Sequence, residues 1–231
     1  MIRVASYNMR KAIGTDRRRR PERIIEVLNE LDADVIALQE ADRRFGARLS
    51  AIPVAMLEQH SDYKAVPFEA RAGSIGWHGN AILVKRHVDI SGHAMIGLPS
   101  LEPRGAVLAD LKVHGEEMRV VGMHLDLSGL WRRRQALAVL AHLAERDGDP
   151  PAVLMGDLNE WSARGGCLKD FGCELRFAEC GRSFHSRRPM AALDRIMVSS
   201  RLDILESGAH MSATARRASD HLPIWADIKP A

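Results

Sequence analysis

Cysteine is scarce in this sequence, and the three that occur are Cys167, Cys173 and Cys180. Their number is odd and no two of them form a CxxC pair. This pattern excludes a disulfide framework and a cysteine-based structural zinc site. We therefore expect three reduced thiols in a cytoplasmic protein.

Long apolar runs are also missing, and none reaches the length of a transmembrane helix. The N-terminal sequence MIRVASYNMRK enters a strand-like alternation at once, so no signal peptide is visible. We expect a protein with no stable membrane anchor. The sequence does not determine its oligomeric state.

A large net charge is absent as well, since 33 basic and 30 acidic side chains leave a formal charge of +3. A charge this small does not by itself indicate nucleic-acid binding. The basic residues do cluster, at Arg17–Arg20 and at Arg132–Arg134. Each cluster suits a polyanionic ligand, and each is equally explained as a solvated surface.

Strands and helices alternate along the chain, which has the 46% apolar content of an ordinary globular protein. The patterns predict strands at 2–8, 35–40, 63–68, 80–85, 152–159, 193–199 and 222–228, and a hairpin over 104–125. They predict helices at 21–31, 50–60, 131–146 and 162–170, the third with a buried stripe of Leu137, Leu140, Ala141 and Ala144. We expect one α/β domain with mixed sheets over residues 1–231.

Polar side chains gather at the ends of these strands. They are Asn8, Glu40, Asn80, His124, Asp126, Asp157, Asn159, Asp194, Asp220 and His221. Any one of them is explained as a turn or strand terminator. Together they predict a site at one edge of the sheets, where α/β proteins build active sites. Its oxygen-rich donor set suits Mg²⁺ or Mn²⁺ better than zinc.

Seven short motifs make the sequence similar to a known family. In chain order they are ASYNMR, VIALQE, GNAIL, GMHLD, MGDLN, LDRIMVS and SDHLPIWADI, which extend from the first strand to residue 228. The chain resembles the endonuclease/exonuclease/phosphatase family, which includes deoxyribonuclease-, abasic endonuclease- and sphingomyelinase-like phosphoesterases. The resemblance implies a four-layer α/β sandwich, two packed β-sheets flanked by helices, with the site at one end.

The resemblance also implies a metal site. Glu40 matches the principal ligand of Mg²⁺ (or Mn²⁺), and Asn8 matches the Asn beside metal and phosphate. Asp220 matches a carboxylate that joins the metal shell directly or through water. At Arg10, where repair endonucleases carry an acidic residue, the chain departs from the family. The metal shell is then poorer in carboxylates, or Arg10 binds substrate.

The catalytic roles are implied in the same way. His221 matches the essential histidine and Asp194 the carboxylate that orients it. Asp157 matches the residue that orients or deprotonates the attacking water, and Asn159 its phosphate-contacting neighbour. His124 matches a position that is His in some relatives and Tyr in others.

Three further expectations concern the surroundings of the site. Asn80 resembles an Asn that supports the site from a neighbouring strand. Arg104 either clamps a phosphate or pairs with Glu102. The eight remaining histidines show no convergent spacing and are interpreted as structural or solvated: His60, His78, His87, His93, His114, His142, His185 and His210.

The expected function is divalent-metal-dependent hydrolysis of a phosphodiester by in-line attack of water. Nucleic acid is slightly favoured as the substrate, because of the basic clusters and the absence of a membrane-inserting hairpin. The alternatives are a phospholipid head group or a sugar or inositol phosphate, and, in another class, an inactive family member that serves as a binding module. Whether Asp157 or His221 is the base, and whether one or two metals act, stays open.

Overall fold

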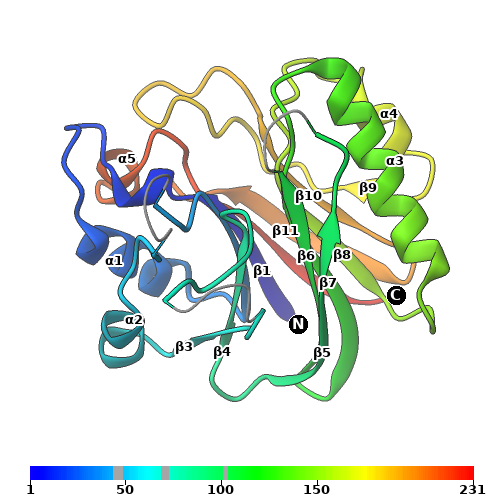
Figure 1. Cartoon of the computed structure of the whole chain (residues 1–231), viewed down its shortest axis with the longest axis horizontal. Helices are drawn as coiled ribbons and strands as arrows, with labels where there is room; N and C mark the ends of the chain where they lie inside the picture. The colour runs from blue at the N-terminus through cyan, green and yellow to red at the C-terminus, as the bar shows by residue number, and fades with distance from the viewer. Residues whose placement is uncertain (44–48, 69–72, 101–103) are drawn as a thin grey trace.

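The computed structural model describes residues 1–43, 49–68, 73–100 and 104–231. In these residues two six-stranded sheets pack face to face (Figure 1). The first has the order β11–β12–β1–β2–β4–β3, with β1 Ile2–Asn8, β2 Val35–Gln39, β3 Tyr63–Ala65, β4 Ala81–Lys85, β11 Leu202–Ala209 and β12 Ile224–Pro230. The second has the order β5–β6–β7–β8–β10–β9, with β5 Asp89–Gly97, β6 Gly105–Val113, β7 Glu116–His124, β8 Ala152–Asp157, β9 Arg176–Phe177 and β10 Asp194–Val198.

Both sheets are mixed in the same way. Each has one parallel pair at its centre, β1 with β2 and β7 with β8, and antiparallel pairs on either side. A helix connects the two strands of each parallel pair, as a crossover requires: α1 (Pro21–Leu31) in the first sheet and α3 (Gly129–Glu145) in the second. The carboxyl ends of β1 and β2 therefore lie together, as do those of β7 and β8.

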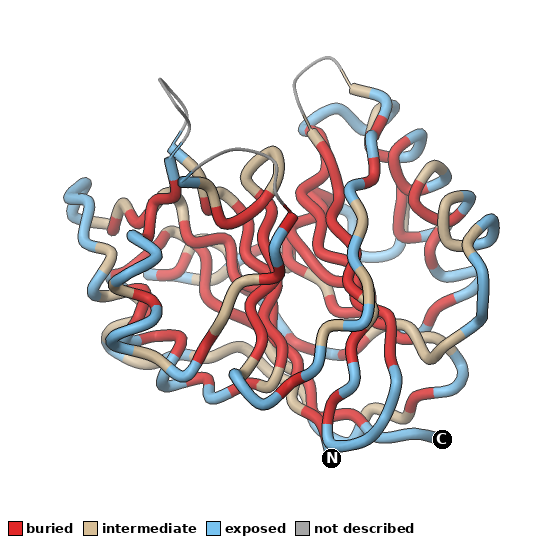
Figure 2. The backbone as a smooth tube through the Cα atoms, turned by 60° about the horizontal axis from the view of Figure 1, so that its bottom comes forward, coloured by how far each residue is buried: buried red, intermediate tan, exposed pale blue. Residues whose placement is uncertain are grey.

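Helices cover the outer face of each sheet, so the fold has the expected four layers. α1, α2 (Val54–His60) and α5 (Ala215–Ala218) lie on one side, and α3 and α4 (Cys167–Phe171) on the other (Figure 1). Figure 2 shows that the buried residues are concentrated in the middle of the molecule, where the two sheets lie between the helices.

Strand alternation divides the apolar residues among three cores, because successive side chains point to opposite faces. Val4, Val35 and Val120 belong to the core between the sheets. Ile36 packs in the core under α1, and Val121 in the core under α3. Nearly continuous apolar strands such as VIAL are thus buried on both faces, as expected for central strands of a layered α/β fold.

Most predicted elements are confirmed, and the differences have local causes. The strands β5, β9 and β11 were not predicted; each is the outermost strand of its sheet, and most residues of β5 and β11 are only half-buried or exposed, so neither carries a strong apolar pattern. The helix predicted from residue 50 begins at Val54, because Pro53 disfavours the helical conformation of the residue before it. The predicted pairing of Arg104 with Glu102 lies outside the described residues.

The predicted buried stripe of α3 is wrong except at Leu140. The buried face consists of Arg132, Gln135, Ala136, Val139 and Leu140. Leu137 is 53% exposed. Two polar side chains occupy the buried face because they are hydrogen-bonded there, Arg132 to Glu160 and Gln135 to the backbone of Asp126 and Pro99. An apolar pattern alone cannot reveal that arrangement. No helix among the described residues is long and apolar enough to cross a membrane.

Candidate active site

Three predicted site residues form one row across the second sheet. In the strand register His124 of β7 lies beside Asp157 of β8, and Asp157 lies opposite Asp194 of β10. Residues directly opposite on neighbouring strands are about 5 Å apart, so backbone pairing alone brings these side chains together. All three are buried.

The first sheet contributes Asn8, which is the last residue of β1. Its Nδ2 donates a hydrogen bond of 2.9 Å to Asp157 Oδ2, and this contact crosses from one sheet to the other. The hydroxyl of Ser219 donates to the backbone carbonyl of Asn8 at 2.7 Å. The loop that leads into β12 thus fixes the end of β1.

His221 stands between Asp194 and Asp157. Its Nδ1 is 2.9 Å from Asp194 Oδ2, and its Nε2 is 3.7 Å from Asp157 Oδ2. Ser183 donates a second hydrogen bond to Asp194 Oδ2. A carboxylate on Nδ1 fixes the orientation of the ring and stabilises its charged form.

The charges around His221 determine its protonation. Burial acts to lower its pKa, but the charge and hydrogen bond of Asp194, with the charges of Asp157 and Asp220, raise the pKa of His221 to about 9. Burial raises the pKa of the Asp194 carboxyl, against the stabilising charge of His221. Near neutral pH the His221–Asp194 pair therefore retains a proton.

His124 lies on the other side of Asp157, with Nε2 at 3.5 Å from Asp157 Oδ2. Burial lowers the pKa of His124 to about 3, because the attraction of Asp157 does not compensate for desolvation and for the repulsion of Arg104 and His221. Burial would raise the pKa of Asp157, yet the neighbouring histidines, the Asn159 N–H and the Asn8 amide hold it below its usual value. Asp157 is thus an ionised acceptor that faces one neutral and one charged imidazole.

The backbone at Asp157 explains the Gly and the Asn of the GDLN motif. A Cβ on Gly156 would lie 1.9 Å from the carbonyl oxygen of Met123, so only glycine fits there. Asn159 has φ 50°, a conformation that Asn tolerates better than most residues. Its N–H donates to Asp157 Oδ1 at 2.9 Å, and its Nδ2 donates to the carbonyl of Leu125 at 2.9 Å.

Glu40 follows β2 in a left-handed backbone conformation with φ 53°. Its carboxylate pairs with Lys11 Nζ, and its carbonyl accepts the N–H of Lys11 at 3.0 Å. The short helical turn Arg10–Ala12 holds Lys11, and all three of its residues have positive φ angles. Such angles are unusual outside glycine, which indicates that the surrounding contacts fix this turn.

Asp220 also pairs with a basic residue of that turn. Arg10 Nε is 3.2 Å from Asp220 Oδ2. The two carboxylates expected to bind metal, Glu40 and Asp220, are thus each held beside a positive charge. Mg²⁺ and Mn²⁺ prefer carboxylate and amide oxygens as ligands, and Glu40, Asp220 and Asn8 carry oxygens of this kind.

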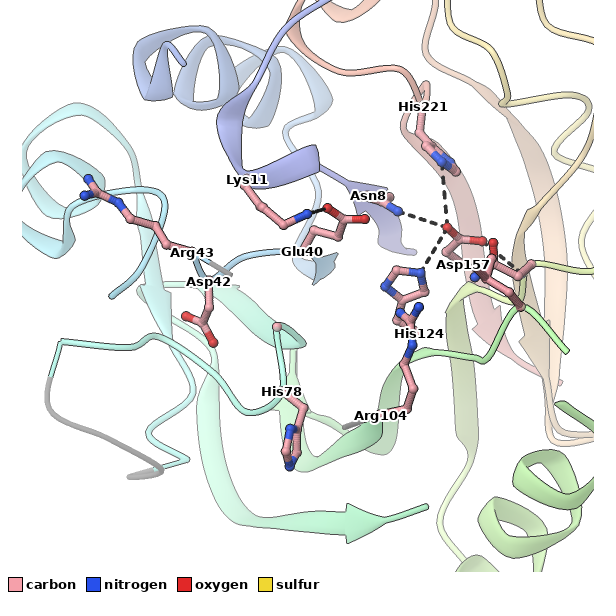
Figure 3. A pocket seen from close by; sticks show the side chains of 13 residues that line it. Asn8, Lys11, Glu40, Asp42, Arg43, His78, Arg104, His124, Asp157 and His221 are labelled. Atoms are coloured by element: carbon pink, nitrogen blue, oxygen red, sulfur yellow. Dashed lines mark hydrogen bonds and ion pairs between the residues drawn. The ribbon is translucent and has the colours of Figure 1, made fainter. Parts of the chain in front are cut away.

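Most of the predicted site residues line one cavity of about 540 Å³ (Figure 3). The lining residues are Asn8, Lys11, Glu40, Asp42, Arg43, His78, Gly79, Arg104, His124, Leu127, Asp157, Asn159 and His221. In Figure 3 Asn8, His124 and His221 converge on Asp157, and Lys11 points to Glu40. The cavity therefore has a wall of catalytic-type groups and a wall that carries both acidic and basic side chains.

The structure places four of the predicted residues outside this lining. Asp194 lies behind His221, and Arg10 and Asp220 form their own pair. Asn80 is buried and donates from Nδ2 to the carbonyl of Gly105 at 2.8 Å, so it connects β4 of the first sheet to β6 of the second.

Four polar lining side chains were missed from the sequence: Lys11, Asp42, Arg43 and His78. Lys11 lies in the short helical turn after β1 and the other three lie in loops, where no periodic pattern places a side chain. Their short distance along the chain from Asn8, Glu40 and Asn80 was the available signal. His78, which the sequence indicates to be structural or solvated, is thus part of the cavity lining.

The family model described as Endonuclease/Exonuclease/phosphatase family matches residues 5–221. The chain belongs to this family, whose members are hydrolases that act on phosphoester bonds. No curated protein matches its sequence significantly.

Solved structures share the fold at low sequence identity. The mannosyl-6-phosphatase Bt3783 of Bacteroides thetaiotaomicron has a TM-score of 0.78 at 22% identity, over 99% of this chain and 100% of that one. The human Nocturnin catalytic domain with bound sulfate has a TM-score of 0.75 at 20% identity, over 100% and 94%. D. rerio TDP2 complexed with a single-strand DNA product has a TM-score of 0.76 at 17% identity, over 99% and 98%. At these identities the likeness shows the fold alone.

Proposed function

We propose that the protein is a divalent-metal-dependent phosphodiesterase, with nucleic acid as its favoured substrate. The observation that carries the proposal is the chain of contacts Asn8–Asp157–His221–Asp194, which joins both sheets at one end of the sandwich. It combines an ionised carboxylate with a charged, oriented histidine on the wall of one cavity. Those are the groups that hydrolysis of a phosphodiester requires.

The proposed mechanism assigns separate tasks to Asp157 and His221. Asp157 orients the attacking water through its ionised oxygens and accepts the proton that the water loses as its oxygen bonds to phosphorus. His221, charged and held by Asp194, stabilises the negative charge of the phosphorane and donates a proton to the leaving oxygen. Asn8 and Asn159 hold Asp157 in place from two sides.

Glu40, Asn8 and Asp220 would hold the metal ion. When bound, Mg²⁺ or Mn²⁺ would supply charge neutralisation at the phosphoryl oxygen. Lys11 forms an ion pair with Glu40, and Arg10 forms one with Asp220. These two basic side chains are therefore suited to contact phosphate oxygens beside the ion.

Several features support a polyanionic substrate. Lys11, Arg43 and Arg104 line the cavity. The exposed cluster Arg17–Arg20 is attached to the site, because Arg19 Nε donates to the carbonyl of Lys11 at 3.2 Å. Basic side chains in the cavity and in this adjoining loop favour a substrate with more than one phosphate.

An aromatic path supports nucleic acid in particular. Trp161 is 66% exposed and packs edge-on against Phe184 with ring centroids 5.9 Å apart. Phe184 lies 4.9 Å from the ring of His221. An exposed indole beside a phosphodiesterase site can stack a base that flanks the scissile phosphate.

The test is hydrolysis of bis-p-nitrophenyl phosphate with Mg²⁺, Mn²⁺ or EDTA, followed by DNA, RNA, phospholipid and sugar phosphate substrates. We expect turnover that needs the metal, and the highest kcat/KM on nucleic acid. A higher kcat/KM on phospholipid or on sugar or inositol phosphate would replace the substrate and retain the chemistry. Absence of turnover on every substrate, in protein shown to bind the metal, would make the chain an inactive binding module.

A further inference from the structure

A second group of ligand-type side chains lies at the end of the sandwich away from the cavity. It consists of Asp34, His87 and His114, whose ligand atoms lie within 4.8 Å of one another. Asp34 precedes β2 and Glu40 follows it, so about 20 Å of extended chain separates this group from the cavity. β7 separates the two places in the same way, because His114 lies just before its first residue and His124 is its last.

We propose that Asp34, His87 and His114 form a binding site for Zn²⁺ or a chemically similar transition-metal ion. Two imidazole nitrogens and one carboxylate oxygen form a donor set that zinc accepts in proteins, with water in the fourth position. Mg²⁺ prefers an all-oxygen shell and is a poor match. The site therefore differs in metal preference from the oxygen-rich cavity.

The backbone holds Asp34 in a defined orientation. Its N–H donates to the carbonyl of Arg3 at 2.8 Å, and its carbonyl accepts the N–H of Lys85 at 3.0 Å. Its side-chain Oδ2 accepts the N–H of Arg3 at 2.8 Å. Oδ1 is thereby turned toward the histidines. A ligand held by hydrogen bonds outside the metal shell is the usual arrangement in metal sites.

His114 is placed by the turn between β6 and β7. Val113 pairs with Glu116, which leaves His114 and Gly115 as a two-residue hairpin turn with φ of 50° and 89°. Its Nε2 lies 2.9 Å from Asp34 Oδ1. Two ligand atoms of a tetrahedral zinc ion are about 3.3 Å apart, given bond lengths near 2.0 Å, so this pair would need to separate by only about 0.4 Å.

His87 completes the group from the turn after β4. Its ring centroid is 5.3 Å from that of His114, and the two rings are inclined by 33°. Both histidines are exposed, so a rotation of the His87 side chain can bring its nitrogen to the ion without disturbing the core. Asp34 and His87 adjoin the first sheet and His114 the second, so a bound ion would connect the two sheets at this end.

The test is calorimetric titration of the full chain with Zn²⁺ after removal of metals with EDTA. Wild type and the variants His87→Gln and His114→Gln are compared, with His60→Gln as a matched exposed control on α2. We expect each cluster variant to lose one binding equivalent or at least about tenfold in Zn²⁺ affinity, since even residues that only support ligands give losses of that size. His60→Gln should bind as wild type does.

A second measurement separates this site from the proposed active site. The Glu40→Gln variant should still bind one equivalent of Zn²⁺ at Asp34, His87 and His114. Zn²⁺ should therefore still raise its thermal midpoint of unfolding. In His114→Gln that rise should be lost, while hydrolysis with Mg²⁺ stays at the wild-type level. If His87→Gln and His114→Gln bind Zn²⁺ with the stoichiometry and affinity of wild type, the cluster is only an ion pair and the proposal is wrong.

Discussion

The side-chain amide of Asn8 donates to Asp157 Oδ2 at 2.9 Å and thereby connects the ends of the two sheets inside the cavity. Asn8 ends β1 and Asp157 ends β8, and 149 positions of sequence separate them. Both side chains are buried, so the contact is shielded from water. It links the structural role of the strand ends to their chemistry.

Replacement of Asn8 by alanine should destabilise the metal-free protein by about 2 kcal/mol, because Oδ2 of the buried Asp157 carboxylate loses its amide donor. Denaturant unfolding in EDTA measures this. Asn29→Ala is the control, since Asn29 donates to the carbonyl of His60 at the exposed surface and should cost about 0.5 kcal/mol or less. Equal losses in the two variants would mean that the contact between the sheets contributes nothing particular.

Replacement of Glu40 by glutamine should lower turnover with Mg²⁺ by at least about a hundredfold while the protein stays folded. The amide keeps the shape of the side chain but removes the charge that is expected to hold the metal. Steady-state kinetics over a range of Mg²⁺ concentrations tests this, with Glu22→Gln on the exposed side of α1 as the control. Near-normal turnover with an unchanged Mg²⁺ requirement would remove Glu40 from the metal site.

Substitutions of His221 and Asp194 should be strongly non-additive. Asp194 is hydrogen-bonded to His221 Nδ1, so its removal should matter little once His221 is alanine. The kcat of His221→Ala, Asp194→Ala and the double variant completes the cycle. Multiplicative losses would show that Asp194 acts independently of the histidine.

The stability of the metal-free protein should fall as pH rises from about 6.5 to 9 through His221. Its pKa is about 9 in the folded chain, against about 6.5 when unfolded, so the folded state retains the proton more strongly. The contribution is complete below pH 6.5, amounts to about 3 kcal/mol at most, and is lost as pH passes 9. Unfolding free energies of wild type and His221→Asn across this range should converge toward high pH.

His124 should make stability depend on pH with the opposite sign. Its pKa of about 3 lies below the unfolded value, so its contribution is present above about pH 6.5 and is lost as pH falls toward 3. The His124→Asn variant should lose less unfolding free energy than wild type as pH falls from about 6.5 toward 3. An unchanged acid limb would show that His124 is not held neutral.

Replacement of Arg17–Arg20 by serine should raise KM for DNA or RNA and flatten its dependence on salt, because fewer counterions are released on binding. Turnover of bis-p-nitrophenyl phosphate should stay nearly unchanged, since the loop supplies binding rather than transition-state stabilisation. The control is Arg134→Ser, which removes one exposed basic residue of the other cluster. Arg132 and Arg133 stay unchanged in this control, because they pair with Glu160 and Asp170.

If the Arg17–Arg20 variant cleaves nucleic acid with the parent KM and salt slope, the loop is a solvated surface. The preference for nucleic acid would then rest on Trp161 and the cavity cations alone. If neither protein cleaves nucleic acid, a phospholipid head group or a small phosphoester becomes the substrate.

The sequence by itself determined the layered fold and the types of group in the site. Strands such as Val35–Gln39 are apolar on both faces, which requires cover on both sides, and a polar residue at each strand end follows from where the buried chain emerges. Because parallel neighbours bring like ends together, Asn8, Glu40, His124 and Asp157 could be assigned to one edge before any coordinates.

Only the tertiary structure decided which of these groups touch and which others join them. The hydrogen bond from Asn8 to Asp157, the pairing of Lys11 with Glu40 and the distal group Asp34–His87–His114 all connect segments that are remote in sequence or lie in irregular loops. The buried face of α3 was misjudged for a related reason, since Gln135 is buried by virtue of its hydrogen bonds. Periodicity records which face of an element is apolar, whereas contacts between loops depend on how the two sheets pack, and no local pattern encodes that.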